Sequence, residues 1–366
     1  MTDSRPPIKW GLLSTARINS RLIPAIRAAQ RAELVAIASR DLTRAQAYAA
    51  EWGIPRAHGS YQALLDDPEI DAVYIPLPNN LHAEWTVRAA EAGKHVLCEK
   101  PLALTPAECE RIIGAVQSNG VVAMEAVMYL YHPLLHKARA LVREGAVGQV
   151  KLVRGSFSFT LDRPNDVRWD PALGGGALWD VGSYPVSFMR WMAGEPEQVF
   201  GWQTLSQSGV DASFAGLLRF PDGVLGAFDC SFCQPFRVQA EVIGDAGRLV
   251  VERPFPVTPE SRIVLYREGQ IKQRTHTLAR RFPAVARKAK ALLRALRLPS
   301  PKAQDAEVIT LPPADPYQCE VEALGAAALA GTPLAVPLTN SRANVATLVA
   351  LYASARQDAP LAPGQP

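Results

Sequence analysis

The 366-residue chain has few cysteines, and their number is odd: five, at positions 98, 109, 230, 233 and 319. An odd and scattered set does not form a disulfide framework, which excludes the small disulfide-stapled secreted proteins. No apolar run approaches the roughly 18 residues that span a bilayer. The N-terminal stretch MTDSRPPIKW is too polar for a secretory signal. These absences predict a soluble, cytoplasmic protein.

Metal-ligand spacings are also missing. The sequence contains no HxH or HExxH pattern, and its CxxC pair, Cys230 and Cys233, lies in a strand-like apolar run. Side chains three apart on a strand point to opposite faces, which favours a structural role over a metal or redox site. We therefore expect no bound metal.

Acidic residues are absent from residues 271–302, a basic insert that holds ten Lys or Arg. The chain has a net charge of +4, so subtracting these ten leaves the remainder at −6 and argues against a nucleic-acid-binding surface. Helical spacing places the leucines of the insert on one side and its cations on the other. We expect this helix to dock on its own domain or across a dimer. Contact of residues 275–302 with an anionic membrane or an acidic partner is the alternative.

The rest of the chain shows two successive patterns of strands and helices. Over residues 1–125, short apolar strands such as IKWGLL, ELVAIAS and KHVLCEKP alternate with helical stretches. This alternation predicts an α/β Rossmann domain, a doubly wound parallel sheet. Over residues 126–366, successive strands with short turns predict an α+β domain on an antiparallel sheet, closed by two helices within 315–356.

The stretch GLLSTARIN, residues 11–19, follows the first predicted strand and precedes a helix. Gly11 matches the first glycine of a dinucleotide-binding loop, and Ala16 stands where the third glycine falls. Ser14 and Thr15 offer donors at the helix N-terminus, where the helix dipole favours a phosphate. Taken alone, the stretch fits either a nucleotide site or a plain turn from strand to helix.

The end of the second predicted strand reads AIASRD and bears on the type of nucleotide. An NAD site carries a ribose-binding carboxylate here, whereas Ser39 and Arg40 can bind a 2′-phosphate. Asp41 comes one place later and is expected to cap the following helix. NADP is therefore favoured over NAD.

Four longer motifs carry a family resemblance. They are PLPNNLHAEWTVRAAEAGKHVLCEKPLALT at 76–105, MEAVMYLYHP at 124–133, GQVKLVRGSFSF at 148–159 and VRWDPALGGGALWDVGSYPVSFMRWMAG at 167–194. With EKP at 99–101, they resemble the Gfo/Idh/MocA oxidoreductases. Within that family they resemble the branch of NADP-dependent D-xylose 1-dehydrogenases and trans-1,2-dihydrobenzene-1,2-diol dehydrogenases. Leu130 stands where this branch often has arginine.

The resemblance implies an NAD(P)-binding Rossmann domain, followed by an open, mostly antiparallel sheet that holds the substrate and often forms a dimer face. Its usual loop, GxxxTAR, adds Arg17 to the residues above, with Ser14 at a place where glycine is commoner. It also implies that Pro78, Asn79 and His82, which follow the fourth strand, lie near the nicotinamide. His82 fits an ordinary helix start equally well. The expected cofactor-binding set is Gly11, Ser14, Thr15, Ala16, Arg17, Ser39, Arg40, Pro78, Asn79, His82, Glu99 and Lys100.

Lys100, Tyr184 and Asp180 are the expected catalytic residues. Lys100 follows a strand, and its ammonium can stabilise charge on a reacting oxygen. The resemblance assigns the acid/base role to Tyr184, and a phenol with a pKa near 10 needs a nearby Lys to act as a base at neutral pH. Asp180 lies four residues earlier on the same helix face and would orient the substrate or Tyr184. A packed aromatic and a helix-terminal charge are the alternatives for these two.

Arg168 and Trp169 precede the glycine run and are the expected substrate contacts, although Trp169 fits a core position equally well. We expect an NADP-dependent oxidoreductase that moves a hydride between nicotinamide and a sugar or cyclic polyol, as in aldose-to-lactone oxidation. Dihydrodiol or dicarbonyl chemistry, and a catalytically silent NADP-sensing regulator, are the alternatives. The expected partners are a small-molecule substrate and further copies of the chain, as a dimer or tetramer.

Overall fold

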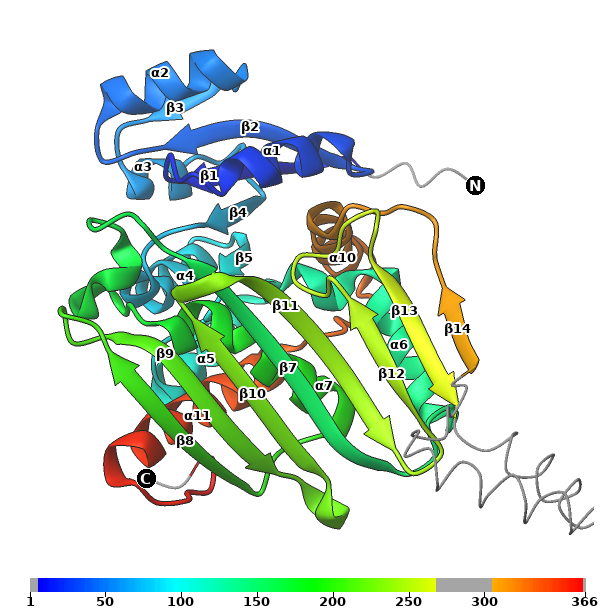
Figure 1. Ribbon diagram of the computed structural model, residues 1–366. Helices are drawn as coiled ribbons and strands as arrows, with labels where there is room; N and C mark the ends of the chain where they lie inside the picture. The colour runs from blue at the N-terminus through cyan, green and yellow to red at the C-terminus, as the bar shows by residue number, and fades with distance from the viewer. Residues whose placement is uncertain (1–5, 268–304, 365–366) are drawn as a thin grey trace, which may run out of the picture.

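The computed structural model describes residues 6–267 and 305–364 (Figure 1). The basic insert 271–302, with its expected helix and contacts, lies outside the described residues. Within the described ranges, none of the helices combines the length and the apolar character that crossing a bilayer requires.

The first sheet has six parallel strands in the order β3-β2-β1-β4-β5-β6, which is the doubly wound order that the alternation predicts (Figure 1). Its strands are β1 Ile8–Leu13, β2 Ala32–Ala38, β3 Arg56–His58, β4 Ala72–Ile75, β5 His95–Glu99 and β6 Ala123–Ala126. Its helices are α1 Asn19–Ala28, α2 Leu42–Trp52, α3 Tyr61–Leu65, α4 His82–Glu91 and α5 Pro106–Asn119.

Local signals set several helix ends in this part of the chain. Thr105 accepts a hydrogen bond from the Glu108 amide and forms a capping box at the start of α5. Gly53 and Gly120 end α2 and α5 in the left-handed conformation, at φ 60° and 62°. Because the six strands are parallel, their carboxyl ends meet at one edge of the sheet.

The second sheet has eight strands in the order β14-β13-β12-β11-β7-β10-β9-β8. Every neighbouring pair is antiparallel except β7 and β10, which are parallel. The mostly antiparallel expectation is therefore confirmed. The strands are β7 Val150–Thr160, β8 Gln198–Leu205, β9 Asp211–Arg219, β10 Leu225–Ser231, β11 Cys233–Gly244, β12 Gly247–Glu252, β13 Arg262–Arg267 and β14 Asp305–Ile309.

Helices cover one face of the second sheet (Figure 1). Helix α7 (Ser183–Ala193) packs on β7, and α11 (Leu338–Gln357) packs on β8. Helix α6 (Pro133–Arg143) contacts β12 and β13, while α10 (Pro316–Ala330) returns to the first sheet and packs against α1. A short π-helix at Leu178–Gly182 runs directly into α7, where the sequence predicts one continuous helix.

Candidate active site

One cleft of about 990 Å³ lies at the carboxyl edge of the first sheet, with the second sheet forming its other wall. The first wall comes from the segments that follow β1, β2, β4 and β5. The second wall comes from β7, the glycine run 174–176 and the π-helix. The volume is at the upper end of the range for small-molecule sites, so the cleft can hold more than a sugar alone.

The segment after β1 forms the first part of this wall and departs from the expected loop. Ser14 has φ 137°, a conformation that favours glycine, and its carbonyl accepts a 2.7 Å hydrogen bond from Asn19 Nδ2. Gly11 lies inside β1, where an added Cβ would be 2.8 Å from the Leu64 side chain of α3. Gly11 is therefore packed against α3, and Ser14 is the first residue of this segment that lines the cleft.

Thr15, Ala16 and Arg17 continue the wall beside the start of α1. No side chain caps this helix, and the amides of Asn19 and Ser20 donate to the carbonyls of Ala16 and Arg17, both at 3.1 Å. The Thr15 hydroxyl and the Arg17 guanidinium, beside the positive end of the α1 dipole, form a set suited to phosphate oxygens. This part of the cleft fits the pyrophosphate of a dinucleotide.

The end of β2 contributes cations rather than a carboxylate. Asp41 accepts hydrogen bonds from the amides of Thr43 (2.8 Å) and Arg44 (3.3 Å), so the predicted helix cap is confirmed. Ser39 is buried, and Arg40 and Arg44 are exposed side chains that line the cleft. Arg44 was not predicted, although its place in the first turn after the strand end is a usable signal.

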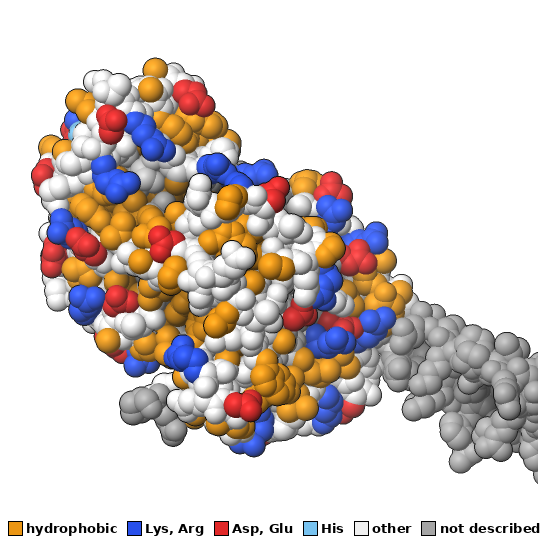
Figure 2. Space-filling model, turned by 60° about the vertical axis from the view of Figure 1, so that its left-hand side comes forward, with side chains coloured by type: hydrophobic (Ala, Val, Ile, Leu, Met, Phe, Trp, Pro, Cys, Tyr) orange, Lys and Arg blue, Asp and Glu red, His pale blue; other side chains and the backbone are white. Residues whose placement is uncertain are grey.

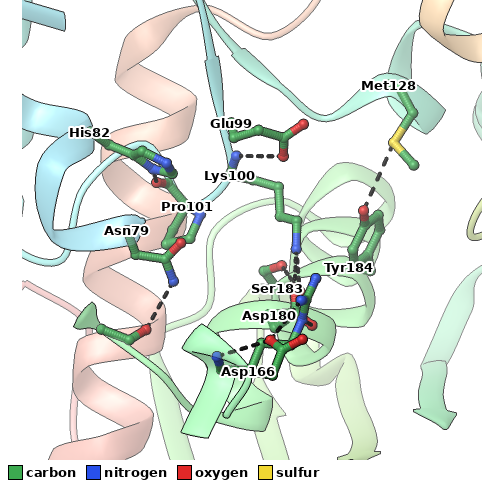
Figure 3. A network of polar contacts seen from close by, with 12 residues as sticks. Asn79, His82, Glu99, Lys100, Pro101, Met128, Asp166, Asp180, Ser183 and Tyr184 are labelled. Atoms are coloured by element: carbon green, nitrogen blue, oxygen red, sulfur yellow. Dashed lines mark hydrogen bonds and ion pairs between the residues drawn. The ribbon is translucent and has the colours of Figure 1, made fainter. Parts of the chain in front are cut away.

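Asn79 and His82 lie where the chain leaves β4. Asn79 Nδ2 donates to the Gly174 carbonyl at 2.9 Å and ties the two walls together (Figure 3). The buried His82 ring lies between the carbonyls of Leu77 (2.8 Å) and Pro101 (2.7 Å), and burial lowers its pKa. A neutral ring donates to only one of these carbonyls, and the His82 side chain lies between the backbone after β4 and the backbone after β5. Pro78 also lines this part of the cleft.

Glu99 and Lys100 lie at the end of β5. The Tyr74 hydroxyl donates to Glu99 Oε1 at 2.5 Å, and the Lys100 amide donates to Glu99 Oε2 at 3.3 Å. Burial raises the pKa of Glu99 above its usual value, although the Lys100 ammonium opposes the shift. The Lys100 side chain leaves this strand end and crosses to the second wall (Figure 3).

Lys100 meets Asp180 of the π-helix. Its Nζ donates to Asp180 Oδ1 at 2.7 Å and to the Asp180 carbonyl at 2.8 Å, while Arg168 Nε donates to Oδ2 at 2.6 Å (Figure 3). Burial alone would raise the pKa of Asp180, but the Lys100 and Arg168 charges outweigh it and hold the pKa well below its usual value. Asp180 is therefore a carboxylate that orients two cations. Arg168 acts on it and on Asp166 rather than standing free.

Tyr184 presents the face of its phenol ring to Lys100, whose Nζ is 5.0 Å from the ring centre. The Tyr184 hydroxyl points toward Met128 Sδ, 3.9 Å away (Figure 3). Burial raises its pKa well above 10, and Tyr317 and Glu99 add to the shift. The ammonium lies over the ring face and does not offset this shift, so Tyr184 carries its proton at neutral pH.

Two expected or suspected pocket residues lie elsewhere. Trp169 packs edge-on against Phe232, with ring centroids 5.2 Å apart, and is not among the residues that line the cleft. The structure thus favours the core alternative for Trp169. Leu130 is buried under the sheet edge and also does not line the cleft.

The aromatic wall of the cleft was missed by the sequence analysis. Phe157 and Phe159 line it from alternate positions of β7, and Tyr317 lines it from the start of α10. The alternation in β7 is visible in the sequence, but which of its faces meets the cleft depends on sheet packing. Tyr317 has no local signal, because its role depends on the return of α10 to the first sheet.

Two family models match the chain. The oxidoreductase family with an NAD-binding Rossmann fold matches residues 8–127, and the GFO/IDH/MocA C-terminal domain matches residues 135–250. Together they cover more than half of the chain. The protein is an oxidoreductase and belongs to the Gfo/Idh/MocA family, as the motifs indicate.

Individual proteins similar to this chain include dehydrogenases and a ketoreductase. D-xylose 1-dehydrogenase (NADP(+)) 2 of Haloferax volcanii is 44% identical over 253 residues, 68% of this chain and 77% of the relative. Trans-1,2-dihydrobenzene-1,2-diol dehydrogenase of Mus musculus is 32% identical over 256 residues, 69% of this chain and 76% of the relative. The structure of KijD10, a 3-ketoreductase from Actinomadura kijaniata in complex with NADP and TDP-benzene, matches with a TM-score of 0.81 at 29% identity. That match covers 95% of this chain and 98% of that one.

Proposed function

We propose that the protein is an NADP-dependent oxidoreductase that moves a hydride between nicotinamide and a carbon of a sugar or related cyclic polyol, in reactions of the aldose-to-lactone type. The observation that carries this proposal is the placement of the Lys100 ammonium over the Tyr184 phenol in the cleft that joins the two sheets. Bound NADP would supply the hydride exchange at its nicotinamide ring.

In this proposal Tyr184 exchanges the proton of the reacting oxygen. Its raised pKa keeps the phenol protonated, so it can donate to an alkoxide that forms when a carbonyl is reduced. In the oxidative direction the deprotonated form of the phenol would accept the proton of the substrate hydroxyl. Lys100 stabilises negative charge on the reacting oxygen, and Asp180 accepts a hydrogen bond from the ammonium and fixes its position.

The preference for NADP over NAD rests on the end of β2. Arg40 and Arg44 line the cleft there, and Asp41 is already engaged as a helix cap. A guanidinium pairs with a phosphate through two parallel hydrogen bonds, whereas a ribose hydroxyl calls for a carboxylate. The NADP named for the xylose dehydrogenase and for the KijD10 complex agrees with this preference.

A second candidate is dihydrodiol or dicarbonyl chemistry. It is favoured by the aromatic wall, where Phe157 lies 5.3 Å from Tyr184 between ring centroids and Phe159 is next on the same face. A flat unsaturated ring would stack there as well as a pyranose. A silent NADP sensor is the third candidate, and it does not require the Lys100–Asp180 pair beside a phenol.

The test is a cofactor and substrate panel with the purified full chain. NADPH fluorescence titration measures cofactor binding, and NADPH formation or consumption is then followed with aldoses, cyclic polyols, dihydrodiols and dicarbonyls. The proposal predicts turnover with at least one aldose or polyol and a preference for NADP. Turnover with diols or dicarbonyls alone supports the second candidate, and tight NADPH binding without turnover on any substrate supports the sensor.

We further propose a homodimer formed through the outer face of the second sheet. Trp202 of β8, Leu217 of β9 and Leu225 of β10 share this face and are 57%, 53% and 52% exposed. Large apolar side chains exposed together on one sheet face are a mark of association. Orange hydrophobic side chains are visible between charged ones on the face that Figure 2 presents.

We propose that each of the two sheets belongs to a part of the chain with its own binding role. Residues 1–125 would hold the cofactor, and residues 126–366 would hold the substrate and the partner copy. The return of α10 to the first sheet means that Tyr317 serves the cofactor side from the far end of the chain. A cytoplasmic location suits the five free thiols, which a reducing compartment keeps unpaired.

A further inference from the structure

A second carboxylate lies behind the π-helix that carries Asp180. Asp211, at the start of β9, is 2% exposed and does not line the cleft. Its Oδ2 accepts a hydrogen bond from the Leu178 amide at 2.7 Å, and its Oδ1 accepts one from the Tyr352 hydroxyl at 2.6 Å. The carboxylate therefore joins three elements that are far apart in the sequence: β9, the π-helix and α11.

The glycine run of the cleft wall is packed directly against this carboxylate. Gly176 has φ 127°, and a Cβ added there would lie 2.1 Å from Asp211 Oδ1 and 2.7 Å from the Tyr352 hydroxyl. Only glycine lets the wall come this close. A movement of the Asp211 side chain would therefore shift both the glycine run of the cleft wall and the π-helix that follows it.

We propose that Asp211, held by Tyr352, is a positioning residue that sets where the π-helix places Asp180 and hence where Lys100 lies. The π-helix spans Leu178–Gly182 and is held at two points: its first amide by Asp211, and the carboxylate and carbonyl of Asp180 by Lys100. This inference rests on the proposed function of the Lys100–Tyr184 pair.

The physical basis is the free amide at a helix start. Leu178 N–H has no acceptor within its own helix, and a buried carboxylate is the strongest acceptor that a side chain can offer it. Without that acceptor the amide must find another partner, and the first turn shifts. A shift of about 1 Å in a catalytic group can lower a rate by about a hundredfold.

The test is a double-mutant cycle in kcat. Asp211→Ala is made in the wild-type chain and in an Asp180→Asn chain, with NADPH affinity measured for each. The proposal expects Asp211→Ala alone to lower kcat about tenfold or more while NADPH affinity stays within about twofold. In the Asp180→Asn chain the same change should cost less than about threefold, because the interaction it acts through is already gone. If Asp211→Ala lowers kcat by the same factor in the wild-type and Asp180→Asn chains, the proposal is contradicted.

Two further variants separate positioning from loss of folding. Asp211→Asn keeps a carbonyl acceptor for Leu178 and should retain most of kcat. Tyr352→Phe removes one donor to the carboxylate and should lower kcat in the same direction by a smaller factor. Asp229→Asn is the matched control and should leave kcat unchanged, because Asp229 is a half-exposed carboxylate on the neighbouring strand that pairs with Arg237.

A measurement that does not depend on catalytic turnover tests this inference separately from the proposed function. Amide hydrogen exchange of the segment 177–184 should quicken in Asp211→Ala and stay unchanged in Asp229→Asn, whichever substrate the enzyme uses. Unchanged exchange in Asp211→Ala overturns the positioning role. Quickened exchange in a protein that turns over no substrate retains the link between Asp211 and the π-helix and removes only the proposed chemistry.

Discussion

Replacing Arg40 and Arg44 by alanine separates the binding of NADPH from that of NADH. Both guanidiniums line the cleft at the end of β2, and neither forms an ion pair with another residue in the parts of the chain that the structure describes. A hydrogen bond to a charged group contributes about 1.5–3 kcal/mol, and about 1.4 kcal/mol corresponds to a tenfold change in affinity.

Both side chains are exposed, so solvent and salt screen them and the lower figure applies. We expect each single alanine variant to weaken NADPH binding about tenfold, and the double variant by up to about a hundredfold. NADH, which lacks the 2′-phosphate, should bind with unchanged affinity. The NADPH effect should also shrink as ionic strength rises.

The assay is a fluorescence titration of each variant with NADPH and with NADH at two salt concentrations. Arg88→Ala is the control, because Arg88 lies on the surface of α4 in an ion pair with Glu84. An equal loss of affinity for the two cofactors would refute the reasoning. It would mean that the arginines support the loop and do not contact the 2′-phosphate.

Three other changes have defined outcomes. Asp180→Asn should lower the free energy of unfolding by about 3 kcal/mol at pH 7, measured in urea, because the largely buried Lys100 loses its carboxylate partner while Arg168 keeps Asp166; a loss below about 1 kcal/mol would contradict this. Trp202→Glu with Leu217→Glu should convert a dimer to a monomer in light scattering without changing NADPH affinity, and an unchanged mass would exclude this face. Asp211→Asn should be more stable than wild type at pH 7.5, with the difference shrinking by pH 4.5.

The sign of the Asp211 prediction follows from its pKa. Burial raises the pKa of Asp211 to about 6, above the value near 4 of an unfolded chain. A raised carboxyl pKa means that the folded state prefers the protonated form. Its stabilising contribution is full below the unfolded pKa and is lost as pH rises through about 6. Asparagine does not titrate, so a wild type whose advantage grew with rising pH would contradict the argument.

Local patterns were sufficient for the first sheet. The alternation of apolar strands with capped helices is a short-range signal, and the doubly wound parallel sheet that it predicts is the one observed. The two closing helices within 315–356 were predicted for the same reason. The strands β13 and β14 were not predicted, because they pair with each other across the basic insert.

The site residues also fall into those that local motifs predict and those that depend on distant packing. Lys100, Asp180 and Tyr184 were found from motifs and do meet in space. What local patterns did not reveal depends on distant packing. Leu64 packs against Gly11, and Phe232 packs against Trp169; both contacts join residues far apart in the sequence.

The pKa of Tyr184 was also beyond local reasoning. The expected nearby lysine is present, but it lies over the ring face, and the burial that sets the pKa comes from elements far along the chain. Asp211 is the same kind of case, since its partners come from the π-helix and α11.

The central claim is that Lys100 and Tyr184 together handle the proton of the reacting oxygen while the hydride moves. Single-turnover hydride transfer from bound NADPH, followed by fluorescence in wild type, Tyr184→Phe and Lys100→Met, measures this directly. The account predicts that both variants bind NADPH within about threefold of wild type, and that hydride transfer slows by about a hundredfold or more in each. Hydride transfer at the wild-type rate in either variant would contradict it.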